Sequence, residues 1–424
     1  MEQYCNSQPE RGELGREGKW HAALVNSLTV RRSSPGSTEN RAADFGLLKL
    51  ALYFLHLGTF GFGGPIALVG HMEKDLVEER EWFTQQDYLQ GLAFCQLSPG
   101  PLAAQLAIYL GWLRYGVVGG TLTGITFILP SFLMVVALAA FYVRFGSLSW
   151  IQGAFYGIGA AAIAIIGRSA IKLVRATIGR DPILWAVFLA MAATTAWKQA
   201  EIIWLFLVCG VLAMFLRAPP KLNRTASASL WLPSLGTLTT GAYRMAALGT
   251  VGALFLFFVK AGAFVFGSGL AIVPFLYGGV VTRFHWLTER QFVDAVAVAM
   301  ITPGPIVITA GFIGYLVAGV LGAVAAAFAV FAPPYFFVLI GAPYYRRFAD
   351  VPQVKAFVQG VTAAAVGAIA GAAYILARRS LIDFPTVLIA GVTFTILTST
   401  KKVSEPLLIV AAGAIGMLLK RNVQ

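Results

Sequence analysis

The chain has 424 residues, of which 58% are hydrophobic and only 12% are charged. Soluble domains are near half apolar and a quarter charged, so this composition excludes an ordinary water-soluble protein and predicts that most of the chain faces lipid or other helices. The formal net charge of +13 sits mainly in short loops between apolar runs. That distribution is typical of membrane orientation and does not indicate nucleic-acid binding.

In chain order, a polar segment comes first and a series of apolar runs follows. Residues 1–43 lack an apolar run of signal-peptide length, so we expect a disordered cytoplasmic tail. Runs long enough to cross a bilayer predict about twelve crossings. They lie at about 46–69, 89–112, 116–142, 149–173, 182–197 and 200–216, and then at 246–281, 292–316, 317–342, 354–377, 382–399 and 404–420.

Two motifs of the first half recur in the second. Phe62-Gly63-Gly64-Pro65 and Ser98-Pro99-Gly100-Pro101 return as Phe266-Gly267-Ser268-Gly269 and Thr302-Pro303-Gly304-Pro305, displaced by 204 positions (302 − 98). Because Trp82 pairs with Trp286 and Pro130 with Pro334 at the same offset, we expect a register without gaps. The sequence predicts an all-α polytopic membrane protein with two repeats of about six transmembrane helices, at 44–216 and 246–420, joined by a polar linker at 217–245.

The distribution of Lys and Arg predicts how each half is oriented. With the N-terminus inside, the first half places eight basic residues in cytoplasmic loops and four outside, which is the expected bias. The same orientation gives the second half four basic residues inside and seven outside, which is the opposite of the expected bias. We therefore expect inverted repeats. Inversion requires one further crossing, which the run Met245–Val281 or the linker before it has room to contain.

The glycine motif predicts a broken helix inside a span. Glycine frees the backbone and proline removes an amide donor, so a run of both ends a helix. Irregular backbone at membrane depth is tolerated where protein or a wet cavity satisfies its polar groups, which makes the break a candidate binding pocket. Tight helix packing is the alternative role. The candidate residues are Gly61, Gly63, Gly64 and Pro65, with Gly267, Ser268 and Gly269 in the second half.

The two proline-glycine-proline motifs predict that a new helix begins near mid-membrane. Ser98 or Thr302 precedes each motif, which is the pattern of a helix N-cap followed by a first-turn proline. The free amides and positive dipole end of such a helix suit an oxyanion. A pair of ordinary proline kinks is the alternative. The candidate ligands are Ser98, Pro99, Gly100, Pro101, Thr302, Pro303, Gly304 and Pro305.

Four ionisable residues lie within or beside apolar runs. His56 and Lys260 each precede the glycine motif by six residues and have apolar flanks, so both are candidates for attracting an anion, with snorkelling or a buried partner as the alternative. Arg168 either faces the cavity or marks the cytoplasmic end of its span. Asp294 is a candidate for proton coupling or for neutralising Lys260, and a position at the surface is the alternative.

Other chemistry finds little support in the sequence. Gln96, Gln105 and Tyr109 flank the first proline motif and are candidate donors to a ligand oxygen, although packing roles are equally compatible. The cysteines and histidines have no metal-ligand spacing, and the chain has no phosphate-binding G-x-x-x-x-G-K-[ST] loop. We expect no cofactor, no metal and no enzymatic activity, because clustered catalytic side chains are missing.

Several motifs together resemble the chromate ion transporter (CHR) family. They are Phe62-Gly63-Gly64-Pro65, Trp82, Gln96-Leu97-Ser98-Pro99-Gly100-Pro101 and Leu129-Pro130-Ser131-Phe132. The resemblance covers roughly residues 46–420 and the long two-domain form of the family. It implies a bacterial inner-membrane protein with oppositely oriented halves that expels chromate, with a link to sulfate because both are tetrahedral dianions. The second half departs from the motif, with Ser268 and no proline after Gly269.

These observations predict a secondary active exporter of chromate that confers chromate resistance. The alternative is a proton-coupled importer of sulfate or a related oxyanion, with Asp294 as the proton site. The expected partners are chromate, with sulfate as a further candidate, and the lipid bilayer. A homodimer stays open, and we expect no nucleic acid.

Overall fold

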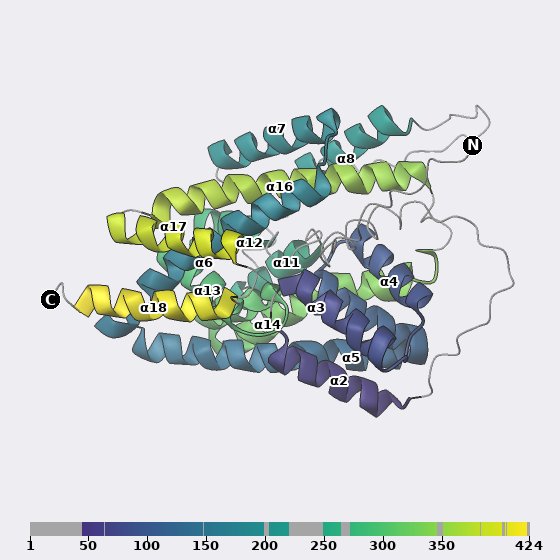
Figure 1. Ribbon diagram of the computed structural model, residues 1–424, viewed down its shortest axis with the longest axis horizontal. Helices are drawn as coiled ribbons and strands as arrows, with labels where there is room; N and C mark the ends of the chain where they lie inside the picture. Colours follow the sequence, from purple (N-terminus) through teal and green to yellow (C-terminus); the bar gives the residue numbers. More distant parts are fainter. Residues whose placement is uncertain are drawn as a thin grey trace, which may run out of the picture.

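A computed structural model describes residues 45–62, 64–146, 148–198, 203–219, 249–263, 272–345, 351–381, 383–400, 403 and 405–421. All regular secondary structure in these ranges is helical (Figure 1). The first half contains α2 (Leu47–Phe60), α3 (Gly64–Glu73), the π-helix η1 (Lys74–Glu79), α4 (Gln85–Leu97), α5 (Leu102–Phe145), α6 (Ser149–Thr177), α7 (Pro182–Lys198) and α8 (Ile203–Arg217). The second contains α11 (Gly249–Ala263), α12 (Ile272–Leu276), the π-helix η3 (Tyr277–Arg283), α13 (Glu289–Ile301), the 3₁₀-helix η4 (Ile306–Ile308), α14 (Thr309–Gly341), α16 (Pro352–Ser380), α17 (Phe384–Ser399) and α18 (Glu405–Arg421).

The two halves repeat each other down to unusual backbone details. Each has a π-helix, η1 and η3, followed by a residue with a positive φ angle, Glu81 at 53° and His285 at 52°. Thr84 and Thr288 then cap α4 and α13 with their side chains. The ends of the π-helices, the residues with positive φ and the threonine caps are all 204 positions apart (288 − 84). The repeat predicted from the glycine and proline motifs is therefore a repeat of structure, even where the sequences differ.

A chain reversal lies inside both α5 and α14. Gly116 and Gly319 have φ angles of 61° and 60°, which glycine adopts without steric cost, and non-helical residues precede them. Close contact of Gly111 with Gly119, and of Gly314 with Gly322, shows that the chain folds back on itself as a tight helical hairpin. The predicted separation of a run at 89–112 from one at 116–142 is explained by this turn.

The predicted gap-free register is wrong by one residue. The proline turn and the reversal are 16 positions apart in the first half (116 − 100) and 15 in the second (319 − 304). The second half has the 3₁₀-helix η4 in this interval, where the first has α-helix. Three residues of 3₁₀-helix rise about 6 Å, as much as four residues of α-helix, so the tighter helix compensates for the missing residue. Beyond this point the repeat offset is 203.

The C-terminal helices of each half pack on the other half. The helices α7 and α8 lie along α16, whereas α17 and α18 lie along α6 (Figure 1). Glycines allow these close approaches: Gly157 of α6 contacts Ala412 of α18, and Gly367 of α16 contacts Phe188 of α7. Small residues at helix contacts are the usual means of tight packing in membranes. The repeats are thus interlaced, and each of the two clusters of buried apolar residues draws on both halves.

Reciprocal contacts show how the halves are related. Gly100 lies against Pro334 of α14, and Gly304 lies against Ser131 of α5, so each proline turn contacts the later part of the other half's hairpin. The Thr121 and Tyr335 hydroxyls are 2.6 Å apart. Thr121 lies at the beginning of the later arm of α5, and Tyr335 lies near the end of the later arm of α14. The two later arms therefore run antiparallel to each other. Since both helices are long and apolar enough to cross a membrane, the two-fold axis lies in the membrane plane and the repeats are inverted.

The membrane-spanning prediction is confirmed in outline and corrected in detail. Four helical stretches are long and apolar enough to cross a bilayer: Leu102–Phe145, Ser149–Arg175, Ile306–Gly341 and Pro352–Arg378. Six shorter apolar helices accompany them. The predicted span at 46–69 is divided between α2 and α3, and the described part of 246–281 repeats this division without adding a crossing. The tail at 1–43 and residues 220–248 of the linker lie outside the described residues.

Candidate functional site

The first proline turn joins α4 to α5, as predicted, but its serine does not cap the new helix. Ser98 is the C-cap of α4, and its backbone N–H donates to the Phe94 carbonyl. Pro99 and Gly100 make the turn, with Gly100 at a φ of 147°, and α5 begins at Leu102 after Pro101. The N-cap prediction is wrong because Pro99, Gly100 and Pro101 separate Ser98 from the first helical residue, and Pro101 takes the N-cap position. The new helix end itself, with its unpaired first amides, is present.

A buried glutamine folds back over this turn. Nε2 of Gln105 donates to Ser98 Oγ at 3.1 Å and to the Pro99 carbonyl at 2.8 Å. Gln105 is fully buried, whereas Ser98 and Pro99 are partly exposed. The sequence suggested Gln105 as a donor to a ligand, but both amide hydrogens are used within the turn. The turn therefore has a rigid inner side and an accessible outer side.

The second proline turn is enclosed. Thr302, Pro303, Gly304 and Pro305 are all buried, and the Thr302 hydroxyl donates to the Ala299 carbonyl of its own helix at 3.1 Å. The Gly304 N–H donates to the Gly61 carbonyl at 3.0 Å. This bond joins the proline turn of the second half to the glycine break of the first. The structure thus brings together two of the four predicted segments through their backbones.

The first glycine break lies where it was predicted. The helix α2 ends at Phe60, Gly61 is its buried C-cap, and α3 begins at Gly64 followed by Pro65. The space around Gly61 is filled by the Leu57 carbonyl and by Leu68, so a larger residue has no room there. Gly63 and the second-half candidates Gly267, Ser268 and Gly269 lie outside the described residues.

The predicted cationic residues do not converge on the proline turns. His56 is exposed on α2, with its ring 5.0 Å from that of Phe60. Lys260 is exposed in the last turn of α11, and no described carboxylate pairs with it. Arg168 on α6 forms an ion pair of 3.5 Å with Glu405 at the start of α18. Of the three, Lys260 is a cation without a described counter-ion, whereas Arg168 connects the two halves.

Asp294 is buried and bonded across the repeats. Its side chain lies within α13, its residue exposure is 3%, and it accepts a hydrogen bond of 2.8 Å from the Tyr142 hydroxyl at the end of α5. The alternative of a surface position is therefore wrong, and the Tyr142 partner replaces the suggested pairing with Lys260. Nothing in the sequence identified Tyr142, because it is 152 residues away. In the first half the corresponding residue is the neutral Gln90.

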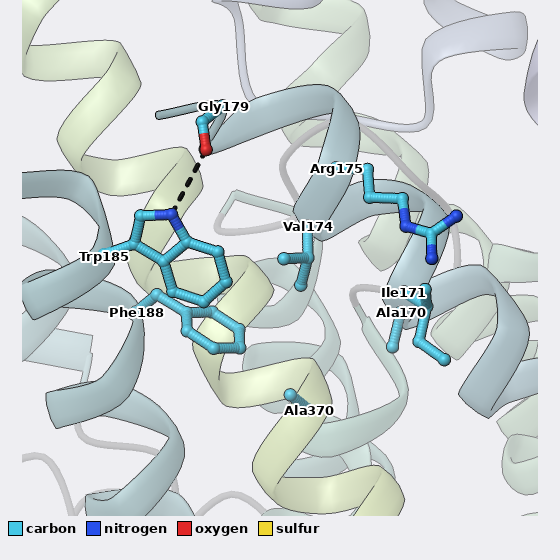
Figure 2. Close-up of a pocket in the computed structure, with 8 residues that line it drawn as sticks. All are labelled: Ala170, Ile171, Val174, Arg175, Gly179, Trp185, Phe188 and Ala370. Carbon is cyan, nitrogen blue, oxygen red and sulfur yellow. Dashed lines mark hydrogen bonds between the residues drawn. The ribbon is translucent and has the colours of Figure 1, made fainter. Parts of the chain in front are cut away.

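A groove of about 510 Å³ lies away from these turns, between α6, α7 and α16. Figure 2 shows Val174, Ile171 and Phe188 around it, with the Trp185 indole bonded to the Gly179 carbonyl and Arg175 beside it. None of the predicted site residues lines the groove. Its lining is mostly apolar, and Arg175 is the one charged side chain among the residues that line it. No cluster of three potential metal ligands occurs among the described residues.

Comparisons with known proteins agree with this architecture. The family model described as "Chromate transporter" matches residues 48–214 and 252–417. A chromate transport protein of Cupriavidus metallidurans is 54% identical over 93% of this chain and 98% of its own length. A probable chromate transport protein of Synechococcus elongatus is 51% identical over 88% and 96%, and a chromate transport protein of Pseudomonas aeruginosa is 31% identical over 93% and 98%. No solved structure matches. A duplicated, interlaced helical fold and these matches identify the chain as a multi-pass membrane transporter of the chromate transporter family.

Proposed function

We propose that this chain is a secondary active transporter that exports chromate from the cytoplasm across the bacterial inner membrane and so confers chromate resistance. The observation that carries the proposal is the bond from the Gly304 N–H to the Gly61 carbonyl. It joins the irregular segments of both halves at their interface, where inverted-repeat transporters hold their substrate. The names of the relatives support chromate as that substrate.

The proposed site consists of the two proline turns and the two glycine breaks, in the repeats at 44–216 and 246–420. The exposed ammonium group of Lys260 is our candidate for attracting the dianion, with His56 and Arg168 adding positive charge. A cell interior that is negative drives anions outward by about 2.3 kcal/mol per charge per 100 mV, or about 4.6 kcal/mol for two charges. Export of chromate therefore does not require ATP hydrolysis.

Labelled chromate uptake by everted membrane vesicles tests the proposal. Vesicles that carry the chain should accumulate chromate when the interior is made positive, and collapse of the potential should abolish the accumulation. Lys260→Ala should reduce the uptake rate, whereas Lys172→Ala, which removes the same charge from an exposed position on α6, is the matched control. Uptake no greater than that of vesicles without the chain contradicts the proposal.

The burial of Asp294 gives the importer alternative a specific residue to test. A carboxylate inside a membrane protein is costly unless it is paired or protonated, which makes Asp294 the candidate for proton coupling. Right-side-out vesicles with an inward proton gradient should accumulate labelled sulfate if the chain is an importer. Asp294→Asn should then uncouple uptake from the gradient. Chromate accumulation in everted vesicles, together with no sulfate accumulation in right-side-out vesicles, favours export.

A further inference from the structure

The Ser98 hydroxyl accepts a hydrogen bond but donates to no described residue. Its oxygen receives the Gln105 Nε2 hydrogen at 3.1 Å, and the side chain is partly exposed at the outer side of the proline turn. A serine hydroxyl has one hydrogen to donate as well as lone pairs that accept. Because one lone pair is engaged by Gln105, the hydrogen of Ser98 is left for an acceptor from outside the turn.

The direction of this bond is fixed by its neighbour. The two ends of a glutamine amide look alike, so their assignment follows from the partners. The Pro99 carbonyl can only accept, and it lies 2.8 Å from the Gln105 amide, so the NH₂ group must face it. The second hydrogen of the same NH₂ group then points to Ser98 Oγ. Gln105 cannot present its oxygen to Ser98 without placing it against the Pro99 carbonyl.

The amide oxygen of Gln105 makes no hydrogen bond to any described residue, which indicates that the side chain acts through its NH₂ group. The Oε1 atom is buried and has no hydrogen-bond partner among the described residues. Buried polar atoms are nearly always bonded, and an exception in a native structure calls for a functional reason or a bound water. A glutamine that served packing alone would be replaced by an apolar residue at no loss. Its amide is instead placed for the two bonds that its nitrogen makes.

The second half lacks this arrangement. The missing residue of the second half falls at η4, so Gln105 has no exact counterpart there, and the nearest polar side chain, Thr309, donates its hydroxyl to the Ile306 carbonyl. Thr302, which corresponds to Ser98, donates to the Ala299 carbonyl, so its hydrogen is used within its own helix. An oxyanion would find a free hydroxyl donor at the first turn and none at the second.

We propose that Gln105 is a positioning residue that holds the Ser98 hydroxyl as a hydrogen-bond donor toward the transported oxyanion. This inference rests on the proposed function and assigns oxyanion recognition to the proline turn of the first half. A tetrahedral dianion presents acceptors only, so a hydroxyl already set to donate requires no reorganisation when the ligand arrives. The second turn closes the interface between the halves and does not contact the ligand through Thr302.

The titratable residues nearest along the chain to this turn are a thiol and two phenols. They are Cys95 on α4, Tyr109 on α5 and, beside Pro334 that lies against Gly100, Tyr335 on α14. Thiols and phenols are uncharged near neutral pH. A glutamate introduced here therefore has no nearby cation among them to stabilise its ionised form.

The decisive variant is Gln105→Glu, measured by chromate uptake in everted vesicles from mildly acidic to mildly alkaline pH. The introduced carboxylate, when ionised, accepts the Ser98 hydrogen and repels the anion, so the uptake rate at low chromate should fall about tenfold, which corresponds to about 1.4 kcal/mol. Protonation restores a donor to Ser98, so the rate relative to the original chain should recover in acid. Gln105→Leu should lower the rate at every pH without that recovery.

Two further variants test the same inference without a new charge. Ser98→Ala should raise the KM for chromate about tenfold with a smaller change in kcat, whereas Thr302→Val should change KM less. Thr309→Val removes the polar side chain nearest to the equivalent part of the second half and should leave KM unchanged. Uptake rates are normalised to the amount of folded chain in the membrane, so that a variant that fails to insert is recognised. If the variants at position 105 fail to insert, the comparison of Ser98→Ala with Thr302→Val tests the inference.

The outcomes separate this inference from the proposed function. If the original chain takes up chromate but the pH profiles of the uptake rate are the same for Gln105→Glu and Gln105→Leu, the proposed export stands and the role of Gln105 is overturned. Equal effects of Ser98→Ala and Thr302→Val overturn it as well. If the original chain takes up neither chromate nor sulfate, both proposals fall together.

Discussion

The two proline turns share a backbone but differ in their surroundings. Gly100 and Gly304 have φ angles of 147° and 92°, and each contacts the later hairpin arm of the other half. The first turn has a partly exposed serine, whereas the second is buried throughout and donates its Gly304 N–H to Gly61. Duplication thus produced two copies of one turn that both contact the other half, of which only the second is buried throughout. We propose that the other is left to meet the ligand.

The largest expected effect comes from filling the second turn. A β-carbon at Gly304 would overlap Ser131 Oγ and would also require a φ angle that side chains rarely adopt. Gly304→Ala should therefore destabilise the folded chain by about 4 kcal/mol, from backbone strain and overpacking together. The measurement is the free energy of unfolding in mixed micelles titrated with a denaturing detergent.

A double variant separates the two causes of this loss. Gly304→Ala combined with Ser131→Ala removes the overlap but keeps the strain, so it should be less destabilised than the sum of the single variants. Gly391→Ala, at an α17 glycine with open space around it, is the matched control. Strict additivity would show that the second turn and α5 do not press on each other.

The next effect concerns the bond between Tyr142 and Asp294. Hydrogen bonds to charged groups contribute more than neutral ones, and their loss leaves a buried carboxylate with fewer donors. Tyr142→Phe should lower the free energy of unfolding by about 2–3 kcal/mol in the same micelle titration. Adding Asp294→Asn removes the charge that needs the donor, so part of the loss should be recovered. No recovery would mean that the Tyr142 hydroxyl does not act through its bond to the Asp294 carboxylate.

The sequence was sufficient to predict the repeat, the inversion and the positions of the breaks that fall among the described residues. The breaks depend on glycine and proline, whose backbone effects are local and strong, and the inversion was indicated by the distribution of Lys and Arg. The one-residue shift between the halves was missed, because it occurs in an apolar run where any alignment looks equally good. The true start of α5 was missed because Ser98 followed by proline resembles a helix N-cap, and only the Gly100 conformation excludes it.

The direction of side chains was harder to predict. His56 and Lys260 have apolar flanks, which suggested that they face the interior, yet both are exposed. On α2, Leu52 and Leu55 are exposed as well, whereas Leu50 and Phe54 are buried. A helix in a membrane is apolar on both faces, so hydrophobic periodicity does not identify its inner side. The Tyr142 to Asp294 contact depends on the interlacing of the halves and has no local signal.

The two hairpin reversals should behave alike, in contrast to the two proline turns. Gly116 and Gly319 have nearly equal φ and ψ angles, near 60° and −150°, and open space around them. Because this region of backbone space is essentially restricted to glycine, substitution by alanine should cost about 2 kcal/mol through strain alone. Gly116→Ala and Gly319→Ala should therefore lower the free energy of unfolding equally. A large difference would show that the halves differ in stability beyond their proline turns.

The smallest expected effect lies at the start of α7. Asp181 and Asp383 cap α7 and α17 in the same way, through bonds to the backbone amides of Leu184 and Thr386. Asp181 also pairs with the Arg217 guanidinium. Partial burial acts to raise the pKa of Asp181, but the amide bonds and Arg217 outweigh it, and the pKa lies below its ordinary value. Asp181→Asn should lose about 0.5 kcal/mol at neutral pH, because the ion pair is partly exposed.

The sign of the pH dependence follows from this lowered pKa. A carboxyl whose pKa is lower in the folded state contributes stability above its unfolded pKa of about 3.9, and this contribution is lost as the pH falls through the folded value. The difference between the original chain and Asp181→Asn should be constant from neutral pH down to about pH 5 and shrink in stronger acid. The measurement is the micelle titration repeated at several pH values, with Arg217→Gln as the partner control. A difference that grows in acid would mean that the Asp181 carboxylate is less stable in the folded chain than in the unfolded one.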